Sequence, residues 1–184
     1  MTFDQIKLQT QIRKLNNGRI SFFAMIKNPQ HIKIGKGVSI AYGTRIEPVC
    51  QWGKRKYRPS IVIGDGVNIE QGCHITCADS VVIGKGASLL PYCMITDISH
   101  DYQNINLPPN RQGITVKRTT IGEHTTIGFG ACVMPGVTVG KHCVIGANSV
   151  VNQDIPDFCV VVGAPARIVK RYDKAKGEWV DSHE

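Results

Sequence analysis

The clearest hydrophobic pattern in the chain is a strict period of six between residues 121 and 156. Six hexapeptides follow one another without a gap, and each begins with an aliphatic residue: Ile121, Ile127, Val133, Val139, Ile145 and Val151. The fifth place of each block is small or β-branched, and glycine holds the second place in four of the six. This period fits neither the 3.6-residue repeat of an α-helix nor the alternation of a plain strand, and it is typical of a parallel β-helix.

Three such hexapeptides close one triangular coil of eighteen residues, each being a brief strand followed by a corner. The branched first residue is expected to point inward and to stack on the residue eighteen places away, while the small fifth residue fits the inner corner. We expect glycine at the second place because it tolerates positive φ where the chain turns. One coil alone cannot bury its inner face, so several must stack.

A short sequence motif ending in Ile–Gly marks the start of four coils, at residues 32–35, 61–64, 81–84 and 119–122. It predicts five coils within residues 32–172. The spacings leave insertions of eleven, two and twenty residues, each after the third hexapeptide of its coil. The two longer insertions, at about 48–60 and 101–118, should therefore leave the solenoid at the same corner, where functional loops tend to gather.

The segments outside the repeats are short. Leu8, Ile12 and Leu15 fall on one helical face, which predicts a short helix within an N-terminal segment of residues 1–31. The apolar run at 22–26 is only five residues long and indicates neither a signal peptide nor a membrane span. Residues 173–184 are expected to form a C-terminal tail.

The charge balance favours an anionic partner. The 184-residue chain carries 22 Lys and Arg against 14 Asp and Glu, a formal charge of +8. A basic surface of this kind suits nucleic acid or a phosphate-bearing small molecule. Because no aromatic RNA-binding motif or zinc-finger spacing is present, we expect a small molecule and no nucleic acid.

Seven cysteines raise the question of disulfides or metal. Cys73, Cys93 and Cys143 all occupy the small fifth place, so we expect them to pack in the interior of a protein from a reducing compartment, the cytoplasm. The neighbouring Cys73 and His74 should point to opposite faces of a strand, which argues against a shared metal ion.

His100 is the candidate for chemistry. With Ile95 and Ser99 expected to face inward, His100 should face outward at the foot of the twenty-residue insertion. An outward histidine flanked by the carboxylates of Asp97 and Asp101 suits a general base near neutral pH. The alternative is a solvated surface histidine.

These features resemble the left-handed β-helix acyltransferases, in particular the sugar O-acetyltransferases that include the galactoside and maltose enzymes and enzymes that decorate polysaccharides. The resemblance covers about residues 32–172. It is carried by the hexapeptides, by the histidine at the foot of a long loop, and by Pro108 with the stretches 97–102 (DISHDY), 112–113 (QG), 135–140 (PGVTVG), 145–151 (IGANSVV) and 161–170 (VVGAPARIVK). It implies an all-β fold with a left-handed helix, whereas the general rule for parallel crossovers would give a right-handed one.

The resemblance implies an enzyme that moves an acetyl group from acetyl-CoA to a hydroxyl of a sugar, a polysaccharide or a lipid-linked oligosaccharide, without a metal ion. It also implies a homotrimer with active sites between neighbouring subunits. His100 would be the general base for direct attack of the hydroxyl on the thioester, with no acyl-enzyme. The backbone N–H of Phe129 would lie near the developing oxyanion.

The same resemblance assigns the residues that bind the acyl donor. Ala147 and Asn152 would line its pantetheine arm, and Arg167 and Lys170 would meet its phosphates. Gln153 occupies a further cofactor-binding position, where the family commonly has lysine.

The chain departs from the family pattern in two other places. Thr126 stands where tryptophan is common, and residues 111–117 contain no glutamate that could orient the base. Asp97, Asp101 or a backbone carbonyl is expected to orient it instead.

Acceptor binding is expected from Asp97, Asp101 and Tyr102 near the base, and from the eleven-residue insertion. That insertion contains the sequence CQWGKRKYR at residues 50–58, in which Trp52 offers a flat face for a sugar ring and Arg55 offers charge for an acidic or phosphorylated acceptor. It lies two coils before the loop of the base, about 10 Å along the helix axis. The alternative is a solvated basic loop or a trimer contact.

Three other functions remain open at this point. One is a transferase of the same fold that acts on an amino sugar or on the hydroxyl of serine. A second is a zinc lyase of the same fold, which needs three outward histidines from the set His74, His100, His124 and His142. A third is a solenoid that only binds partners.

Overall fold

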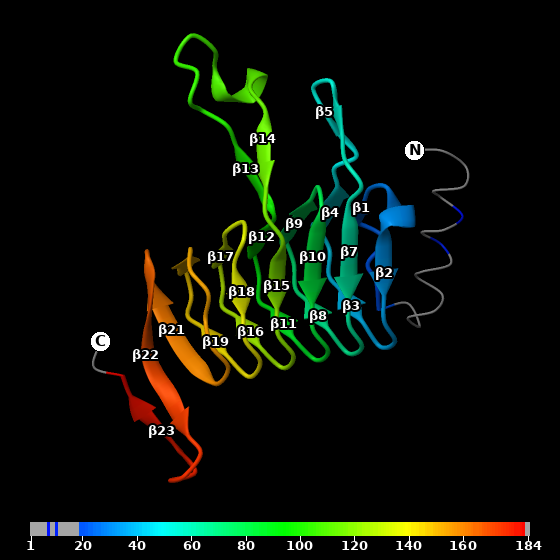
Figure 1. Ribbon diagram of the computed structural model, residues 1–184. Coiled ribbons are helices and arrows are strands. Elements are labelled where there is room, and N and C mark those ends of the chain that lie inside the picture. Colours follow the sequence, from blue (N-terminus) through cyan, green and yellow to red (C-terminus); the bar gives the residue numbers. More distant parts are fainter. Residues whose placement is uncertain (1–6, 8–9, 11–18, 183–184) are drawn as a thin grey trace.

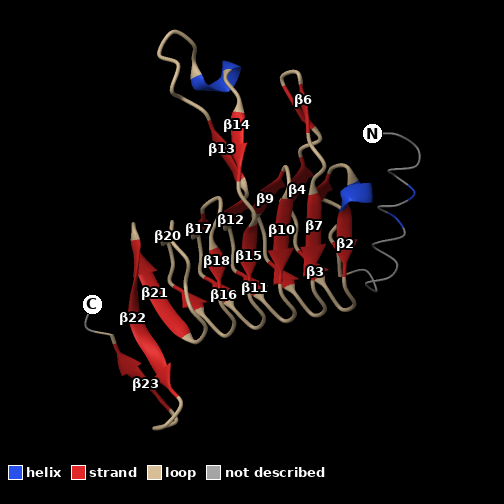
Figure 2. Cartoon of the chain, in the orientation of Figure 1, coloured by secondary structure: helices blue, strands red, loops and turns tan. Residues whose placement is uncertain are grey.

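A three-sided parallel β-helix forms the body of the protein (Figure 1). The structure is a computed structural model that describes residues 7, 10 and 19–182. The predicted N-terminal helix at residues 8–15 lies outside the described residues, apart from Thr10. Between residues 19 and 182 the only helices are two single 3-10 turns, η1 (Pro29–His31) and η2 (Pro109–Arg111) (Figure 2).

Three parallel sheets make the faces of the solenoid. The first face consists of β2 (Ile32–Ile34), β7 (Ser60–Ile63), β10 (Ser80–Ile83), β15 (Thr119–Ile121) and β18 (Thr138–Val139). The second face consists of β3 (Ser39–Ile40), β8 (Asn68–Ile69), β11 (Ser88–Leu89), β16 (Thr126–Ile127), β19 (Val144–Ile145) and β21 (Cys159–Gly163). The third face consists of β1 (Met25–Ile26), β4 (Arg45–Pro48), β9 (His74–Cys77), β12 (Met94–Thr96), β17 (Cys132–Val133) and β20 (Val150–Val151).

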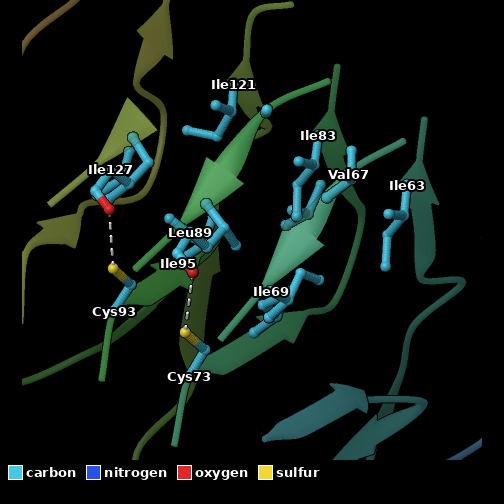
Figure 3. Packing of buried hydrophobic residues seen from close by; sticks show 14 of the residues in the cluster. Ile63, Val67, Ile69, Cys73, Ile83, Leu89, Cys93, Ile95, Ile121 and Ile127 are labelled. Atoms are coloured by element: carbon cyan, nitrogen blue, oxygen red, sulfur yellow. Dashed lines mark hydrogen bonds between the residues drawn. The ribbon is translucent and has the colours of Figure 1, made fainter. Parts of the chain in front are cut away.

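The strand register confirms the five predicted coils. On the first face Ile63 pairs with Ile83 and Ile83 with Ile121, so residues that begin successive coils lie above one another across the insertions. These first-place side chains fill the interior, and Ile83 is fully buried (Figure 3). Each coil thus buries its inner face against the next, as the repeat requires.

The buried cysteines confirm the packing prediction. Cys73, Cys93 and Cys143 are each only 1% exposed. Their thiols donate to backbone carbonyls of the next coil, and Cys93 Sγ lies 3.0 Å from the oxygen of Gly128. Figure 3 shows two of these thiols pointing along the solenoid. His74, next to Cys73, lies on the outer side of the strand, as expected.

The reason we expected for the second-place glycines is wrong. These glycines do not have positive φ; the positive φ occurs two residues later, at positions such as Gly66 and Gly86. A Cβ on Gly84 would lie 2.7 Å from the backbone nitrogen of Glu123 in the next coil. At Gly84 glycine is therefore required because successive coils approach too closely there for any side chain.

Strands lie beyond both expected ends of the repeat region. Ile20 bridges to Ile40, and β1 pairs with β4, so a partial coil precedes the first complete one. At the other end β22 (Ala166–Asp173) pairs antiparallel with β21, and β23 (Glu178–Asp181) pairs with β22. The segment 173–184 that we expected as a tail therefore contributes a strand, and this hairpin covers the edge of the second face.

Two arms project from one corner of the solenoid, as the spacing of the insertions predicts (Figure 1). The first arm is the hairpin of β5 (Gln51–Trp52) and β6 (Arg55–Lys56). The second arm is the ribbon of β13 (Ile98–His100) and β14 (Ile114–Val116), which carries η2 near its tip. We call the corner between the third and first faces the arm corner. Across the described residues, no helix has the length and apolar character needed to cross a membrane.

Shortening Ile83 should destabilise the solenoid. Because Ile83 is fully buried between Ile63 and Ile121, Ile83→Ala should lower the free energy of unfolding by about 2–5 kcal/mol. Val82→Ala, in the same strand but facing outward, should cost less than about 1 kcal/mol. Urea unfolding of both variants measures the difference. Equal losses would contradict the inward stacking of first-place residues.

Candidate active site

His100 ends β13 and lies exposed on the second arm, as expected from the sequence. Ser99, which we expected to face inward, is exposed. The chain leaves the solenoid after Thr96 and pairs instead with β14, where His100 lies opposite Ile114. The arm, and not the hexapeptide phase, therefore sets the direction of the imidazole.

Trp52 of the first arm packs directly on His100. The two rings meet edge to face, with centroids 4.9 Å apart and planes at 63°. The indole Nε1–H of Trp52 also donates to the carbonyl of Gln112, at 2.9 Å. These two contacts tie the arms together across two coils, so the imidazole has a half-buried aromatic wall on one side.

Gln112 has a role that the residue pattern alone did not indicate. Its side-chain amide donates to the carbonyls of Asn104 and Leu107 at 2.9 and 2.7 Å, and it accepts from the backbone N–H of Asn104 at 3.1 Å. One side chain thus closes the tip of the second arm, while its own carbonyl holds Trp52. A lone amide in a polar loop gives no sequence signal for such a role beyond the resemblance of its motif.

Asp97 does not bind an acceptor or orient the base, contrary to our expectation. It is fully buried, and its carboxylate accepts the backbone N–H groups of Ala78, Asp79 and Ser80, each at 2.8 Å. Burial and the charge of Asp97 raise the pKa of Cys77, whose thiol lies 3.4 Å from Asp97 Oδ2. Asp97 therefore fixes the root of the second arm to the preceding coil.

Asp101 follows His100 but does not face it. Successive side chains of a strand point to opposite sides, and the carboxylate of Asp101 accepts the hydroxyl of Thr115 at 2.8 Å. The ring of Tyr102 is largely exposed beyond the ribbon. No carboxylate among the described side chains hydrogen-bonds His100, so Trp52 is the group that constrains its ring.

A groove of about 560 Å³ lies between the two arms. Arg55, Tyr57 and Arg58 line it from the first arm, and Asp101 and Thr115 line it from the second. Of the expected acceptor-binding residues, Trp52 contacts His100, whereas Arg55 and Asp101 line this groove, which His100 does not line.

The expected cofactor-binding residues lie elsewhere on the chain. Phe129 and Ala147 occupy successive coils at the corner between the second and third faces, where the N–H of Asn148 donates to Phe129 O at 2.7 Å. We call this the Phe129 corner. The remaining four are exposed, two just after β20 and two on β22: Asn152, Gln153, Arg167 and Lys170. The third face separates the Phe129 corner from the arm corner of the same chain.

Three other histidines, His74, His124 and His142, have structural partners. His74 lies 3.0 Å from Glu47 on the third face; burial raises the pKa of Glu47, but hydrogen bonds from Lys27 and His74 outweigh it and hold this pKa below its usual value. His124 and His142 stack on each other with ring centroids 5.0 Å apart. Among the described residues, no three metal-ligating side chains cluster.

Removing the charge of Asp97 should destabilise the root of the second arm. Asp97→Asn places an amide donor against backbone donors, so we expect a loss of about 2 kcal/mol or more in the free energy of unfolding. Asp101→Asn, near the surface of the arm, should cost less than about 1 kcal/mol. Urea unfolding of both variants tests this. An unchanged stability of Asp97→Asn, together with a weaker acceptor affinity, would return Asp97 to the acceptor site.

The sequence of this chain is similar to those of known transferases. The family described as "Bacterial transferase hexapeptide (six repeats)" matches residues 118–153. A putative lipopolysaccharide biosynthesis O-acetyl transferase, WbbJ of Escherichia coli, is 30% identical over 179 residues, which is 94% of this chain and 88% of that protein. A serine acetyltransferase of Synechococcus elongatus is 33% identical over 111 residues, 60% of this chain and 43% of that protein.

Among solved structures, an N-acyltransferase from Bacillus cereus, AntD, is similar in fold. A mutant of AntD in complex with coenzyme A and dTDP-4-amino-4,6-dideoxyglucose superposes with a TM-score of 0.72 at 20% identity, covering 85% of this chain and 82% of AntD. This likeness concerns the fold alone, and it confirms the predicted left-handed parallel β-helix. The chain therefore belongs to the hexapeptide-repeat transferases, the family that its resemblance to the left-handed β-helix acyltransferases predicted.

Proposed function

We propose that the protein transfers the acetyl group of acetyl-CoA to a hydroxyl group of a sugar, free or within a polysaccharide or lipid-linked oligosaccharide. The observation that carries this proposal is the exposed imidazole of His100 on an arm braced by Trp52. The near full-length relative WbbJ supports a sugar hydroxyl as the acceptor. The coenzyme A held by AntD supports the donor.

His100 acts as the general base. The acceptor hydroxyl gives its proton to an imidazole nitrogen as its oxygen attacks the carbonyl carbon of the thioester. The resulting tetrahedral intermediate collapses with cleavage of the carbon–sulfur bond, and the thiolate of coenzyme A takes the proton back from the imidazolium. A positioned base of this kind contributes about 10²- to 10⁴-fold to the rate.

The backbone N–H of Phe129 stabilises the oxyanion of this intermediate. It makes no hydrogen bond within the part of the chain that the structure describes, so it is available as a donor. The carbonyl of the same residue is held by Asn148, and its ring packs on Tyr92 with centroids 5.5 Å apart. A donor fixed in this way needs no reorganisation when charge develops.

The donor lies along exposed residues after the Phe129 corner. Ala147 and Asn152 line the pantetheine arm, with Gln153 beside Asn152, and Arg167 and Lys170 meet the phosphates. The ammonium of Lys170 lies 3.5 Å from Asp181, and both side chains are about half exposed or more, so this surface pair gives way to a phosphate at little cost. The net charge of +8 favours an anionic donor.

The active site is shared between subunits of a homotrimer. His100 on the arm corner and Phe129 lie on opposite sides of the third face of one chain, so a second chain supplies the missing half of each site. We place the reaction in the cytoplasm, where the seven free thiols remain reduced.

A serine hydroxyl is the second candidate acceptor. The Synechococcus serine acetyltransferase supports it, but this chain covers only 43% of that protein, against 88% of WbbJ. An amino sugar, as held by AntD, is the corresponding acceptor for transfer to nitrogen. The sugar hydroxyl is favoured because the relative that matches almost throughout bears that description.

Replacing His100 tests the proposed base. His100→Ala should lower kcat about 10²- to 10⁴-fold and leave acetyl-CoA affinity unchanged, because only proton transfer is lost. The measurement is thiol release from acetyl-CoA in the presence of sugar, serine and amino-sugar acceptors. His74→Ala and His124→Ala are the matched controls and should retain turnover. A wild-type protein that releases no thiol with any acceptor, or a loss confined to the controls, would contradict the proposal.

Mixed trimers test the shared site. His100→Ala lacks the base, and Ala147→Trp should block the pantetheine path, so each variant alone should be inactive. In a one-to-one mixture of refolded subunits, about a quarter of the sites combine an intact His100 with an intact neighbouring Ala147, and activity should recover to about that level. Mass measurement should give three chains. A stable mixed trimer with no recovery would place the whole site within one chain.

A further inference from the structure

The groove between the arms has an excess of positive charge. Arg55, Lys56 and Arg58 line it from the first arm, and none of them pairs with an acidic side chain within the described part of the chain. Two carboxylates also line the groove, those of Asp79 and Asp101. Three uncompensated cations around a concave surface attract an anion.

Both carboxylates of the groove already have partners. Asp79 Oδ2 accepts from Arg118 Nε at 2.9 Å, so its charge is balanced from outside the groove. Asp101 Oδ1 accepts the hydroxyl of Thr115, which leaves Oδ2 able to accept a sugar hydroxyl. An anionic ligand in the groove is therefore attracted by the three cationic side chains and repelled only weakly by Asp79. Asp101 adds a hydrogen-bond acceptor for a sugar hydroxyl.

The shape of the groove is set before any ligand binds. Arg55 lies over the ring of Tyr57, with its guanidinium carbon 5.3 Å from the ring centroid, which leaves the edge of the guanidinium free to donate. Trp52 holds the first arm to the second through His100 and Gln112. A preformed site loses less conformational entropy when it binds a ligand.

The groove also adjoins the base. Asp101 directly follows His100, and Ile114, which lines the groove, pairs with His100 across the ribbon. Paired residues of an antiparallel ribbon share a face, so Ile114 lies on the same side as His100, and a sugar ring that extends from the groove past Ile114 approaches the imidazole. A single acceptor can therefore fill the groove and present a hydroxyl to His100.

We propose that this groove binds the anionic group of the acceptor, a phosphate ester or a sugar carboxylate, and thereby presents a neighbouring hydroxyl to His100. Arg55 and Arg58 supply the bidentate donors that such groups favour. The inference rests on the proposed acetyl transfer at His100. It adds that the acceptor is an acidic sugar rather than a neutral one.

Acceptor preference tests the groove. Galactose, galactose 1-phosphate and galacturonic acid are compared as acceptors with acetyl-CoA at fixed ionic strength. The wild-type protein should favour one of the charged sugars over galactose by about tenfold or more in kcat/KM, and which one it favours separates phosphate from carboxylate recognition. In Arg55→Ala with Arg58→Ala this ratio should fall about tenfold or more, because the two forked donors are gone.

The matched control removes the same charge elsewhere. Lys33→Ala with Lys85→Ala lowers the net charge equally on the outside of the solenoid and should keep the wild-type preference. An equal loss of the preference for charged sugars in both double variants would mean that only long-range electrostatic attraction acts, and it would overturn the proposed anion site in the groove. A wild-type protein that shows no preference for charged sugars would also overturn it.

Direct titration separates this inference from the proposed function. Galactose 1-phosphate and galacturonic acid are titrated into the wild-type protein and both double variants by calorimetry, without acetyl-CoA. Binding that is lost only in the arginine variant supports the groove even if no acetyl transfer is found, and in that case the proposed function alone fails. Absence of binding by both ligands overturns the groove whatever the protein catalyses.

Discussion

The close approach of successive coils is the constraint on which the rest of the structure depends. At Gly84 the backbone of one coil meets that of the next with no room for a Cβ. Two of the three corners are locked as well, because an N–H of each coil donates to a carbonyl of the coil before it, as from Gly86 to Asp65 and from Asn148 to Phe129. Extra residues at those two corners would interrupt the continuous series of hydrogen bonds between coils. The arm corner alone absorbs them, and even there the core register resumes at Ile83 and Ile121.

This constraint explains how residues far apart in the chain meet around one imidazole. Since both long insertions must leave by the same corner, the first arm rises beside the second and Trp52 reaches His100. The coil between them contributes as well, because three successive N–H groups at its arm corner, from residues 78–80, bind Asp97 at the root of the second arm. The scaffold thus supplies rigidity, and the second arm carries the proposed base.

The sequence predicts the features that the six-residue period determines, and it does not predict those that depend on the two arms. The spacing of the repeats predicts where the coils start, which cysteines face inward and that both insertions share a corner. It does so because coils can stack only when equivalent positions of the repeat lie above one another. The spacing does not predict the burial of Asp97 or the exposure of Ser99, since both depend on where the chain leaves the repeat. The strand β23 was missed for a similar reason: it adds to the second face by antiparallel pairing, which carries no hexapeptide signal.

The histidines show how structural positions differ from the position of the proposed base in this fold. His124 and His142 occupy corners with φ of +55° and +51°, and each stacks on an aromatic ring one coil away, a row that continues to Phe158. A side chain in such a row is held by the same repeat that holds the core, and moving it would disturb its neighbours. His100 has left the repeat, and Trp52 is the one described side chain whose contact constrains its ring. Its arm can therefore serve catalysis without any cost to the stacking of the coils.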